Sequence, residues 1–487
     1  MKNAAVSELK RLLARACLAA LVLLAASPGS RLVAAPDAPP TKPNVLFIAI
    51  DDLNHWVGHL KRNPQTRTPH IDRLAARGVA FTRANCAAPV CNPSRAALMS
   101  GLRPSTSGVY DNGQDWKRVI GKELTLTTQF LEAGYDVFGA GKIYHASAHR
   151  PREWTDYFTP GGGGLRRHPA AADEGVGGIK FYPLANDDED MPDYKTVSYG
   201  LEKLKAPAGK PFFLAIGLVK PHMPFSVPKK YFDQFPLESI DLPPYREDDL
   251  DDVPASGVKM AKPQGDHAKM MASGRWKEAV RAYLATIAFC DAMVGRLLDG
   301  LEQSPHRDNT IIVLWGDHGW HLGEKQHWRK FALWEESARA PMIWVAPGVT
   351  MPGGVCRRPV DFMSIYPTLC DLAGVAVPQH VEGVSLRPLL SDPQAAWERP
   401  ALTTFHRGNH SLRSERWRYI RYADGGEELY DHETDEYEWT NVAGEASHAS
   451  VKAELAQWLP KVDQAELPRN PPAAKAARKR KRETGAH

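Results

Sequence analysis

The chain has 487 residues, enough for one large α/β domain with an appendage or for two domains. Its hydrophobic content of 43% and charged content of 24% are those of an ordinary globular protein and exclude a disordered, collagenous or coiled-coil chain. The net charge of +4 comes from the two ends, because residues 1–35 and 471–487 are both rich in lysine and arginine. The part between them is mildly acidic, so we expect no nucleic-acid partner.

The N-terminus has the pattern of a secretory signal peptide. Lys10, Arg11 and Arg15 precede an apolar run over 16–26, and small residues follow. The run is too short to span a bilayer, and no other segment approaches the roughly 18 apolar residues that a membrane span needs. We therefore predict a signal peptide over 1–35 and an exported protein, periplasmic or secreted, with a buried N-terminal helix as the alternative.

The C-terminal end and the cysteines carry weaker signals. Residues 466–487 form a basic segment that we predict to be a disordered tail, with attraction to an acidic polymer as the alternative. The six cysteines do not have the spacing of a disulfide framework. Cys290 lies on the apolar side of a predicted helix, where a buried thiol is expected. Cys356 and Cys370 could pair in an oxidising compartment, and their spacing does not decide it.

From Asn44 onward, apolar runs of strand length alternate with runs of helical periodicity. The predicted strands cover residues 45–50, 135–138, 212–218 and 310–315. The predicted helices cover residues 69–77, 124–133, 276–301 and 364–373. This alternation predicts an α/β fold with a large, mostly parallel sheet flanked by helices on both faces.

After Pro378 the chain changes to short strands joined by turns. Strands at 417–422 and 428–430 flank a Gly-Gly turn, a pattern typical of an antiparallel sheet. We therefore predict a catalytic domain over 43–376 and a small C-terminal α+β subdomain over 377–465.

Polar residues suited to chemistry come directly after the apolar strands. In an open parallel sheet the C-terminal ends of the strands meet at one edge, where ligands bind. We therefore expect the following residues to converge: Asp51, Asp52, Lys142, His145, His222, Asp317 and His318. Crowded carboxylates repel each other unless a cation neutralises them, and oxygen ligands favour Ca²⁺ or Mg²⁺. Taken alone, the Asp51-Asp52 pair is equally compatible with a solvated turn.

The segment Cys91-Asn-Pro-Ser-Arg95 is the most informative one in the chain. Pro93 suits the first turn of a helix that continues through Met99, which places Cys91 at the helix N-terminus. The helix dipole and Arg95 both favour an anion there. By itself the segment is compatible with a nucleophilic thiolate or with a buried structural cysteine.

These motifs together resemble the signature of the type I sulfatases, a formylglycine-dependent family of the alkaline-phosphatase superfamily. In that family the cysteine of Cys-x-Pro-Ser-Arg, here 91–95, is oxidised to formylglycine after translation. Met-Ser-Gly-Leu-Arg-Pro follows at 99–104. Further motifs occur in the family's order: the strand at 43–52, Gly141-Lys-Ile-Tyr-His145, Lys220-Pro-His222 and Gly316-Asp-His-Gly-Trp-His-Leu-Gly-Glu324. The resemblance runs from about 43 to 441 and is closest to the iduronate-2-sulfatase-like branch.

The resemblance implies an alkaline-phosphatase-like fold, one bound Ca²⁺ ion and a formylglycine made from Cys91. The implied metal ligands are Asp51, Asp52, Asp317, His318 and an oxygen of the hydrated aldehyde at Cys91. The implied catalytic residues are Cys91, Arg95, Lys142, His145, His222, Asp317 and Lys330.

The resemblance also implies a role for each catalytic residue. The hydrated aldehyde would attack sulfur while Asp317 takes its proton. Arg95, Lys142 and Lys330 would hold the sulfate oxygens. His222, with Lys330, would protonate the departing alcohol, and His145 would then help to expel the sulfate and restore the aldehyde.

One residue departs from the common family pattern. Many sulfatases have Asp-Asn where this chain has Asp317-His318, and an imidazole nitrogen is a poor match for a hard cation. The alternative for His318 is a hydrogen-bonded position beside the metal. Trp320, His321 and the segment 405–410 are candidates for shaping the sugar pocket.

The implied function is hydrolysis of a sulfate ester of a sulfated carbohydrate. The implied partners are a sulfated sugar or polysaccharide and a formylglycine-generating maturation enzyme. One alternative is a phosphodiesterase or phosphonate monoester hydrolase with the same nucleophile, which rates on aryl sulfate and aryl phosphate esters would separate. The other is a non-catalytic protein that binds sulfated polysaccharide and keeps Cys91 unmodified.

Overall fold

The structure is a computed structural model that describes residues 42–121, 124–146, 149–207 and 209–470. The predicted signal peptide lies outside the described residues, as does most of the predicted basic tail. Within the described ranges, no helix combines the length and the hydropathy that crossing a bilayer requires.

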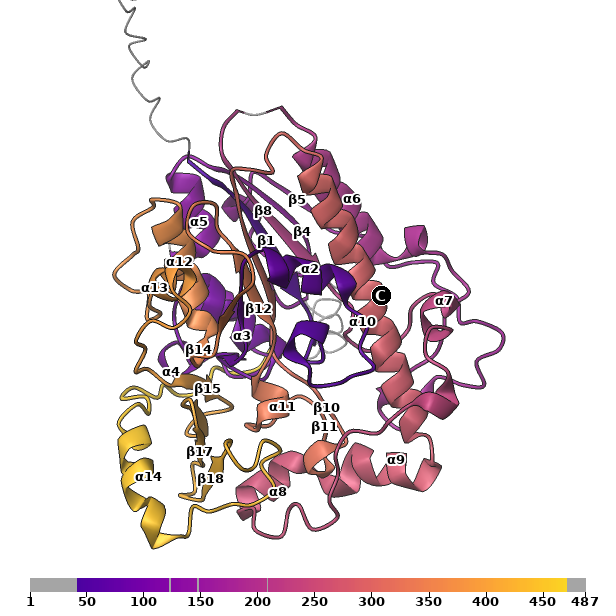
Figure 1. Ribbon diagram of the computed structural model, residues 1–487, viewed down its shortest axis with the longest axis vertical. Helices are drawn as coiled ribbons and strands as arrows, with labels where there is room; N and C mark the ends of the chain where they lie inside the picture. The colour runs from indigo at the N-terminus through magenta and orange to yellow at the C-terminus, as the bar shows by residue number, and fades with distance from the viewer. Residues whose placement is uncertain (1–41, 122–123, 147–148, 208, 471–487) are drawn as a thin grey trace, which may run out of the picture. The chain divides into compact units, whose positions relative to one another are not determined.

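An eight-stranded sheet forms the centre of the described body (Figure 1), in the order β13-β2-β12-β9-β1-β8-β4-β5. Its inner strands are β1 (Asn44–Ile50), β4 (Asp136–Gly141), β8 (Phe212–Leu218) and β9 (Thr310–Gly316). Its outer strands are β2 (Val79–Phe81), β5 (Asp156–Phe158), β12 (Met342–Val345) and β13 (Gly354–Cys356). Only β12 runs antiparallel to its neighbours, so the predicted mostly parallel sheet is confirmed.

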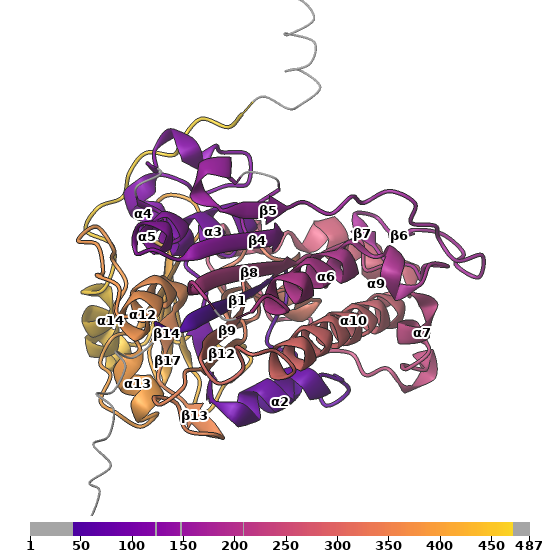
Figure 2. The ribbon, with the colours of Figure 1, turned by 90° about the horizontal axis from the view of Figure 1, so that it is seen from above.

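Helices cover both faces of this sheet (Figure 2). One face packs against α2 (Pro69–Arg77), α6 (Pro192–Leu204) and α10 (Trp276–Glu302). The other packs against α3 (Cys91–Ser100), α5 (Leu126–Glu132) and α12 (Ile365–Leu372). Strand β1 shows the reason, because Leu46 and Ile48 enter the first core whereas Val45 and Phe47 enter the second. Successive side chains of a strand point to opposite faces, so a continuous apolar strand serves two cores.

The long predicted elements agree with the structure to within a few residues. The strand predicted at 212–218 is β8, and the helices predicted at 69–77 and 276–301 are α2 and α10. The sequence pattern did not reveal β2, β12 and β13. Strands of three or four residues offer too few positions for a pattern to emerge.

A second, four-stranded antiparallel sheet lies near the C-terminus, as predicted. Its strands are β15 (Ala401–Thr404), β16 (His410–Arg413), β17 (Trp417–Arg421) and β18 (Glu427–Asp431), and helix α14 (Ala449–Ala456) follows. Leu402, Leu412, Tyr419 and Leu429 form a core of its own on one face.

Every cysteine that the structure describes is a buried free thiol. Cys356 in β13 and Cys370 in α12 are therefore not paired, which answers the question that their spacing left open. Cys290 is buried in α10, as its position on the apolar side predicted.

Candidate active site

Four neighbouring strands deliver the polar residues to one edge of the sheet. Asp51-Asp52 follows β1, Lys142 follows β4, and Asp317-His318 follows β9. The turn that carries His222 follows the fourth strand, β8. Strands β8, β1 and β9 end at the same height in the sheet, because Ile50 at the end of β1 pairs with Leu218 on one side and with Gly316 on the other. The structure thus brings the strand-end residues together, although up to 267 positions separate Asp51 from His318 along the chain.

Cys91 is the first residue of α3, and its sulfur lies at the centre of this edge. The Lys330 Nζ lies 2.8 Å from Cys91 Sγ, the His318 Nε2 lies 3.3 Å from it, and the Lys142 Nζ lies 3.9 Å from it. The residue is fully buried. A group attached at position 91 is therefore enclosed by cationic and imidazole nitrogens.

Four potential metal ligands surround the same sulfur: Asp51, Asp52, Asp317 and His318. One ligand atom from each, together with Cys91 Sγ, forms a set in which all atoms lie within 4.8 Å of one another. Two of the carboxylate oxygens, Asp51 Oδ1 and Asp52 Oδ2, are buried without a hydrogen-bond partner. Buried polar atoms are normally satisfied, so these two oxygens and their oxygen-rich neighbours fit a hard divalent cation.

His318 offers a bare nitrogen to this set. Its Nδ1 lies 3.0 Å from the Gly319 carbonyl oxygen, to which it donates, so Nε2 is free of a proton. Burial lowers the pKa of His318, which keeps the ring neutral. Nε2 lies 3.3 Å from Asp52 Oδ1 and 3.5 Å from Asp317 Oδ1. A carbonyl that fixes the tautomer in this way is typical of a metal-binding histidine.

Arg95 is turned toward the acidic residues more than toward open space. Its Nε donates to Asp317 Oδ2 at 2.8 Å, and its Nη1 donates to the carbonyls of Lys142 and Ile143. Nη2 has no hydrogen-bond partner and lies 3.5 Å from Asp51 Oδ1. Arg95 thereby fixes Asp317 and leaves one nitrogen free for an anion.

The charges in the cluster stabilise one another in their ionised forms. Burial opposes ionisation of Asp51, but Lys142, His222 and Arg95 outweigh it and hold the pKa of this carboxyl well below its usual range. Burial likewise lowers the pKa of Lys330, and Asp52 more than compensates, so the ammonium remains charged. The Cys91 thiol is different, because burial and Asp51 raise its pKa well above the usual value. A reactive thiolate is therefore disfavoured at this position.

The two histidines expected near the substrate differ in their contacts. His222 is 34% exposed, and its Nε2 lies 3.7 Å from Asp52 Oδ2. Its Nδ1 lies 2.6 Å from the Met223 carbonyl oxygen, which leaves Nε2 facing the cluster. His145 is half-buried, and its Nδ1 has no hydrogen-bond partner among the described residues. Burial and Lys142 lower the pKa of His145 to about 4.

Two residues that support His222 were not predicted as part of the site. The Asp193 carboxylate accepts the backbone N–H groups of Val219 and Lys220 at 2.8 Å each. The buried Lys220 amine donates to the carbonyls of His222 and Pro224, at 3.1 and 2.6 Å. These contacts fix the turn that carries His222. Lys220 lay inside a quoted motif, whereas Asp193 could be found only from the fold.

The expectation that Trp320 and His321 shape a sugar pocket is wrong. Both side chains are fully buried. His321 Nδ1 is hydrogen-bonded to Ser337 Oγ at 2.9 Å, and the Trp320 ring packs against Phe225. The Lys330 Nζ lies 5.7 Å from the centroid of the Trp320 ring, so Trp320 packs beside the cluster inside the protein.

The mostly parallel sheet and the polar cluster at its carboxyl edge define an α/β protein with a candidate active site at the strand ends. The sulfatase family profile matches residues 43–375. The profile of the C-terminal region of N-sulphoglucosamine sulphohydrolase matches residues 323–465. The chain belongs to the sulfatase family and is a sulfuric ester hydrolase, which confirms the resemblance found in the sequence.

Relatives support this assignment over most of the chain. The chain is 40% identical over 449 residues to a sulfatase of Formosa agariphila, a match that covers 87% of each protein. It is 30% identical over 392 residues to the iduronate 2-sulfatase of Homo sapiens, covering 69% of this chain and 70% of that one. Among solved structures, the phosphonate monoester hydrolase of Agrobacterium radiobacter has a TM-score of 0.72 at 23% identity and covers 86% and 94% of the two chains. This last likeness concerns the fold.

Proposed function

We propose that this sulfatase hydrolyses a sulfate ester of a sulfated carbohydrate, using a formylglycine derived from Cys91 and one bound Ca²⁺ ion. The observation that carries the proposal is the surroundings of Cys91 Sγ, where two ammonium groups and four potential metal ligands enclose one buried atom. The likeness to iduronate 2-sulfatase supports a sulfated uronate as the sugar.

Asp51, Asp52, Asp317 and His318 would hold the calcium ion. The two carboxylate oxygens without hydrogen-bond partners, Asp51 Oδ1 and Asp52 Oδ2, support this assignment. The ion would supply positive charge that balances the carboxylates and orients an oxygen at position 91. Formylglycine, once hydrated, supplies a hydroxyl that can attack sulfur and later return to an aldehyde.

The lysines and Arg95 bind the anionic part of the substrate. The Nζ atoms of Lys142 and Lys330 lie within 3.9 Å of Cys91 Sγ, so a sulfate group next to position 91 meets both ammonium groups. Lys142 also donates to Asp51 and Lys330 to Asp52, and each ammonium group has further hydrogens for the substrate. Arg95 Nη2, which makes no hydrogen bond, is a third donor. Fixed positive charge in a buried site stabilises the extra negative charge of the transition state.

Proton transfers fall to Asp317, His222 and His145. One oxygen of Asp317 lies within 4.8 Å of Cys91 Sγ and can take a proton from a hydroxyl at position 91. His222 stands partly exposed beside the carboxylates, so its Nε2 can hold the proton that the departing alcohol needs. With its pKa lowered to about 4, His145 is neutral near pH 7 and can accept a proton.

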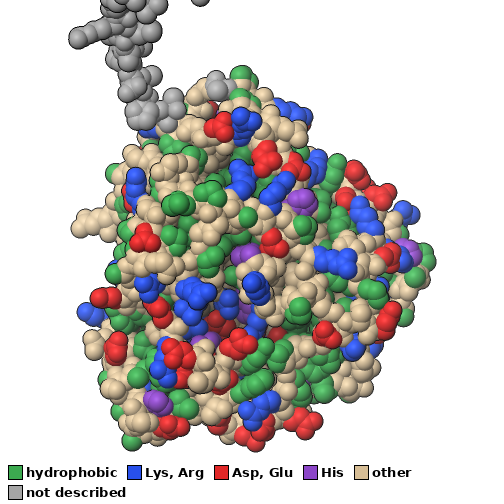
Figure 3. All heavy atoms as spheres, viewed as in Figure 1, with side chains coloured by type: hydrophobic (Ala, Val, Ile, Leu, Met, Phe, Trp, Pro, Cys, Tyr) green, Lys and Arg blue, Asp and Glu red, His purple; other side chains and the backbone are tan. Residues whose placement is uncertain are grey.

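The remaining parts of the proposal concern the protein as a whole. We infer an exported protein with a signal peptide over 1–35 and a formylglycine-generating enzyme as its maturation partner. We also divide the chain into a catalytic domain over 43–376, a C-terminal subdomain over 377–465 and a basic tail over 466–487. Figure 3 shows basic and acidic side chains interspersed on one face of the protein.

Peptide mass spectrometry of protein purified from its natural host tests the nucleophile. We expect the peptide that contains Cys91 to be lighter than the thiol form by about 18 Da, with a hydrated form beside it. An intact thiol in protein that still turns over 4-nitrophenyl sulfate would contradict the formylglycine.

Relative rates on two aryl esters test the reaction. We expect turnover of 4-nitrophenyl sulfate to exceed that of 4-nitrophenyl phosphate. Faster turnover of the phosphate ester would favour the phosphonate monoester hydrolase alternative. A phosphonate monoester hydrolase is among the solved structures with a similar fold. Binding of sulfated polysaccharide without turnover of either ester would favour the non-catalytic alternative.

A further inference from the structure

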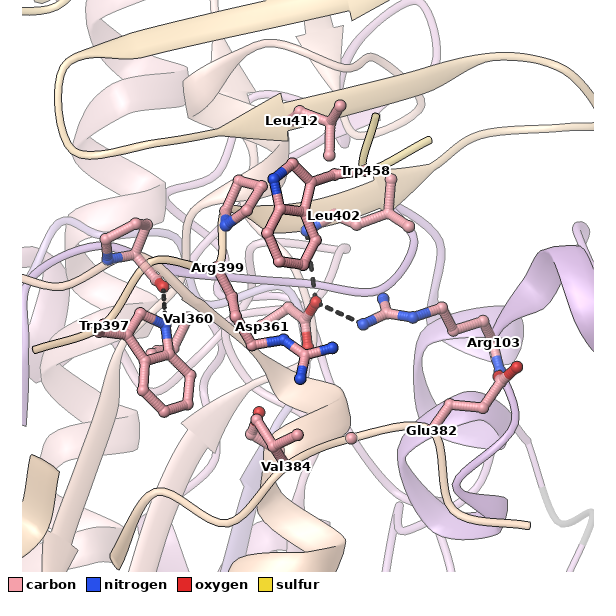
Figure 4. A pocket seen from close by; sticks show the side chains of 14 residues that line it. Arg103, Val360, Asp361, Glu382, Val384, Trp397, Arg399, Leu402, Leu412 and Trp458 are labelled. Atoms are coloured by element: carbon pink, nitrogen blue, oxygen red, sulfur yellow. Dashed lines mark hydrogen bonds and ion pairs between the residues drawn. The ribbon is translucent and has the colours of Figure 1, made fainter. Parts of the chain in front are cut away.

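A second pocket lies where the body of the protein meets the C-terminal sheet (Figure 4). It has a volume of about 120 Å³ and contains none of the residues around Cys91. Its member closest to Cys91 along the chain is Arg103, beyond the far end of α3. A helix of ten residues is about 15 Å long, so the pocket is separate from the candidate active site.

The acidic residues of this pocket are already paired. Asp361 Oδ2 accepts a hydrogen bond from Arg103 Nη2 at 2.9 Å and another from the Leu402 backbone N–H at 3.3 Å. Glu382 accepts hydrogen bonds from the Arg103 backbone N–H and, at 2.7 Å, from the Thr106 hydroxyl. Asp361 is thus ion-paired with Arg103, whereas Glu382 is held by neutral donors on the Arg103–Thr106 segment.

Arg399 is the arginine of the pocket that makes no ion pair in the described part of the chain. Its side chain is exposed, and no carboxylate of the described residues lies within ion-pair distance of its guanidinium. The guanidinium lies 5.6 Å from the centroid of the Trp458 ring. In Figure 4 the Arg399 side chain extends below this ring toward the middle of the pocket. The lining as a whole has no net charge, because it contains two arginines and two carboxylates. Arg399 differs from Arg103 in that its guanidinium donors are not engaged by a carboxylate and remain available to a ligand.

Aromatic surface borders this charge on two sides. Trp458 is 39% exposed, which is unusual for so large an apolar side chain. Trp397 is held at the other side of the pocket, because its indole N–H donates to the Pro359 carbonyl at 2.9 Å. Leu402 and Leu412 are buried apolar residues of the wall.

We propose that this pocket is a secondary binding site for a sulfated or carboxylated sugar unit of a polymeric substrate, an inference that rests on the proposed carbohydrate substrate. The planar Arg399 guanidinium can donate two parallel hydrogen bonds to a sulfate or carboxylate group. The apolar face of a pyranose ring can pack against the exposed indole of Trp458. A binding site separate from the candidate active site can hold one part of a polysaccharide while another part reaches Cys91. Such binding raises the local concentration of substrate at the active site.

Direct binding of a fluorescent heparin octasaccharide to the full-length, calcium-loaded protein tests the proposal. We expect Arg399→Ala and Trp458→Ala each to weaken binding about fivefold, and the double variant to weaken it more. Arg416→Ala is a matched control, because Arg416 also lies over a tryptophan, Trp417, but is paired with Asp431. We expect this control to bind like the wild type.

Further ligands identify what the pocket recognises. A desulfated octasaccharide should bind weakly and without dependence on Arg399, and millimolar inorganic sulfate should compete poorly. Unchanged octasaccharide binding by Arg399→Ala would overturn the proposal, as would an equal loss in Arg416→Ala. If inorganic sulfate bound as tightly as the sugar, the pocket would be a free-anion site, and the proposal would again fail.

Kinetics separate this proposal from the proposed function. We expect both pocket variants to keep the wild-type kcat/KM on 4-nitrophenyl sulfate and to raise KM on the polysaccharide with little change in kcat. An equal loss on both substrates would indicate a structural defect and contradict the proposal. Absence of aryl sulfate turnover in the wild type would refute the proposed function, whereas the binding comparison would still decide the role of the pocket.

Discussion

Two buried clusters in this protein each combine carboxylates, cationic side chains and a histidine, and they differ in whether the carboxylates are satisfied. The first is the set around Cys91. The second, which we name the joining cluster, links the body to the C-terminal sheet and consists of Glu335, Arg413, Arg418, His432 and Glu438. Each contains two or more carboxylates and a histidine whose candidate ligand atoms lie within 4.8 Å of one another.

The carboxylates of the joining cluster are fully paired within the protein. Glu335 Oε2 is bonded to Arg418 and lies 3.3 Å from Arg413 Nε. Glu438 Oε1 lies 2.5 Å from Arg418 Nε and 2.9 Å from His432 Nε2. Around Cys91, in contrast, two carboxylate oxygens lack a hydrogen-bond partner. The two clusters therefore differ in whether their carboxylate oxygens are satisfied within the protein, and only the set around Cys91 combines unsatisfied oxygens with a full set of candidate metal ligands.

Replacement of Cys91 should have the largest effect on activity and a small effect on stability. We expect Cys91→Ala to lower sulfatase turnover by at least about a thousandfold, because the nucleophile is removed. Thermal unfolding should show a midpoint close to that of the wild type. Cys290→Ala is the matched control, since Cys290 is an equally buried thiol that is not among the candidate ligand atoms, and this variant should keep its activity. Turnover that survives in Cys91→Ala would remove this cluster from the mechanism.

Removal of the metal should come next in size and should affect only the first cluster. We expect dialysis against EDTA to abolish most turnover and added Ca²⁺ to restore it. Asp52→Asn should raise the calcium concentration needed for half-maximal activity by about tenfold or more, because one charged oxygen ligand is lost. Glu438→Gln should leave this calcium requirement unchanged, and a shift in that variant would show that the joining cluster also binds the ion.

Disruption of the joining cluster should lower the stability of the fold and leave the sulfatase activity of the folded protein unchanged. Arg418→Met leaves Glu335 and Glu438 buried with fewer partners, which we expect to cost about 3–5 kcal/mol of unfolding free energy. Denaturant unfolding measures this loss, and activity per folded molecule should stay near the wild-type value. Arg416→Ala removes an exposed arginine of the same sheet and should leave stability almost unchanged. If Arg418→Met kept full stability, the clusters would not differ as described.

The smallest effect should be a pH dependence of stability that the joining cluster contributes. Burial opposes ionisation of Glu438, but Arg418 and His432 outweigh it and lower the pKa of this carboxyl. A carboxyl with a lowered pKa stabilises the fold above its unfolded pKa of about 4.5, and this stabilisation is lost as the pH falls through the folded value. The difference in thermal midpoint between wild type and Glu438→Gln should therefore be greatest near neutral pH and shrink below about pH 4.5. A difference that grows toward low pH would contradict the sign.

Much of the fold could be predicted because the inner strands are long and continuously apolar. β1 and β8 each contain seven buried residues, and this run length identifies a strand covered on both faces. Strand β12 was missed, since four residues carry no clear pattern, and its antiparallel direction depends on the strands beside it.

The residues of the candidate site could be predicted from the sequence, whereas the contacts between their side chains could not. Asp51, Asp52, Asp317 and His318 follow strands whose ends could be located, so their convergence was expected from the parallel order of the sheet. The roles assigned to them remain predictions. The contact between Lys330 and Cys91 joins residues 239 positions apart, and the side chain of Asp193 supports His222 from a helix without any motif.

By itself, the sequence determined the class of fold, the family and the identity of the residues at the strand ends, because hydrophobic periodicity and short motifs are local properties of a chain. The tertiary structure alone decided which charges are satisfied. It paired Glu335 with Arg418 across 83 positions, left oxygens of Asp51 and Asp52 without hydrogen bonds, and left Arg399 without an ion pair beside Trp458. Whether a buried polar atom finds a hydrogen-bond or ion-pair partner depends on distances between residues that come together only when the chain folds. A local sequence pattern does not determine those distances.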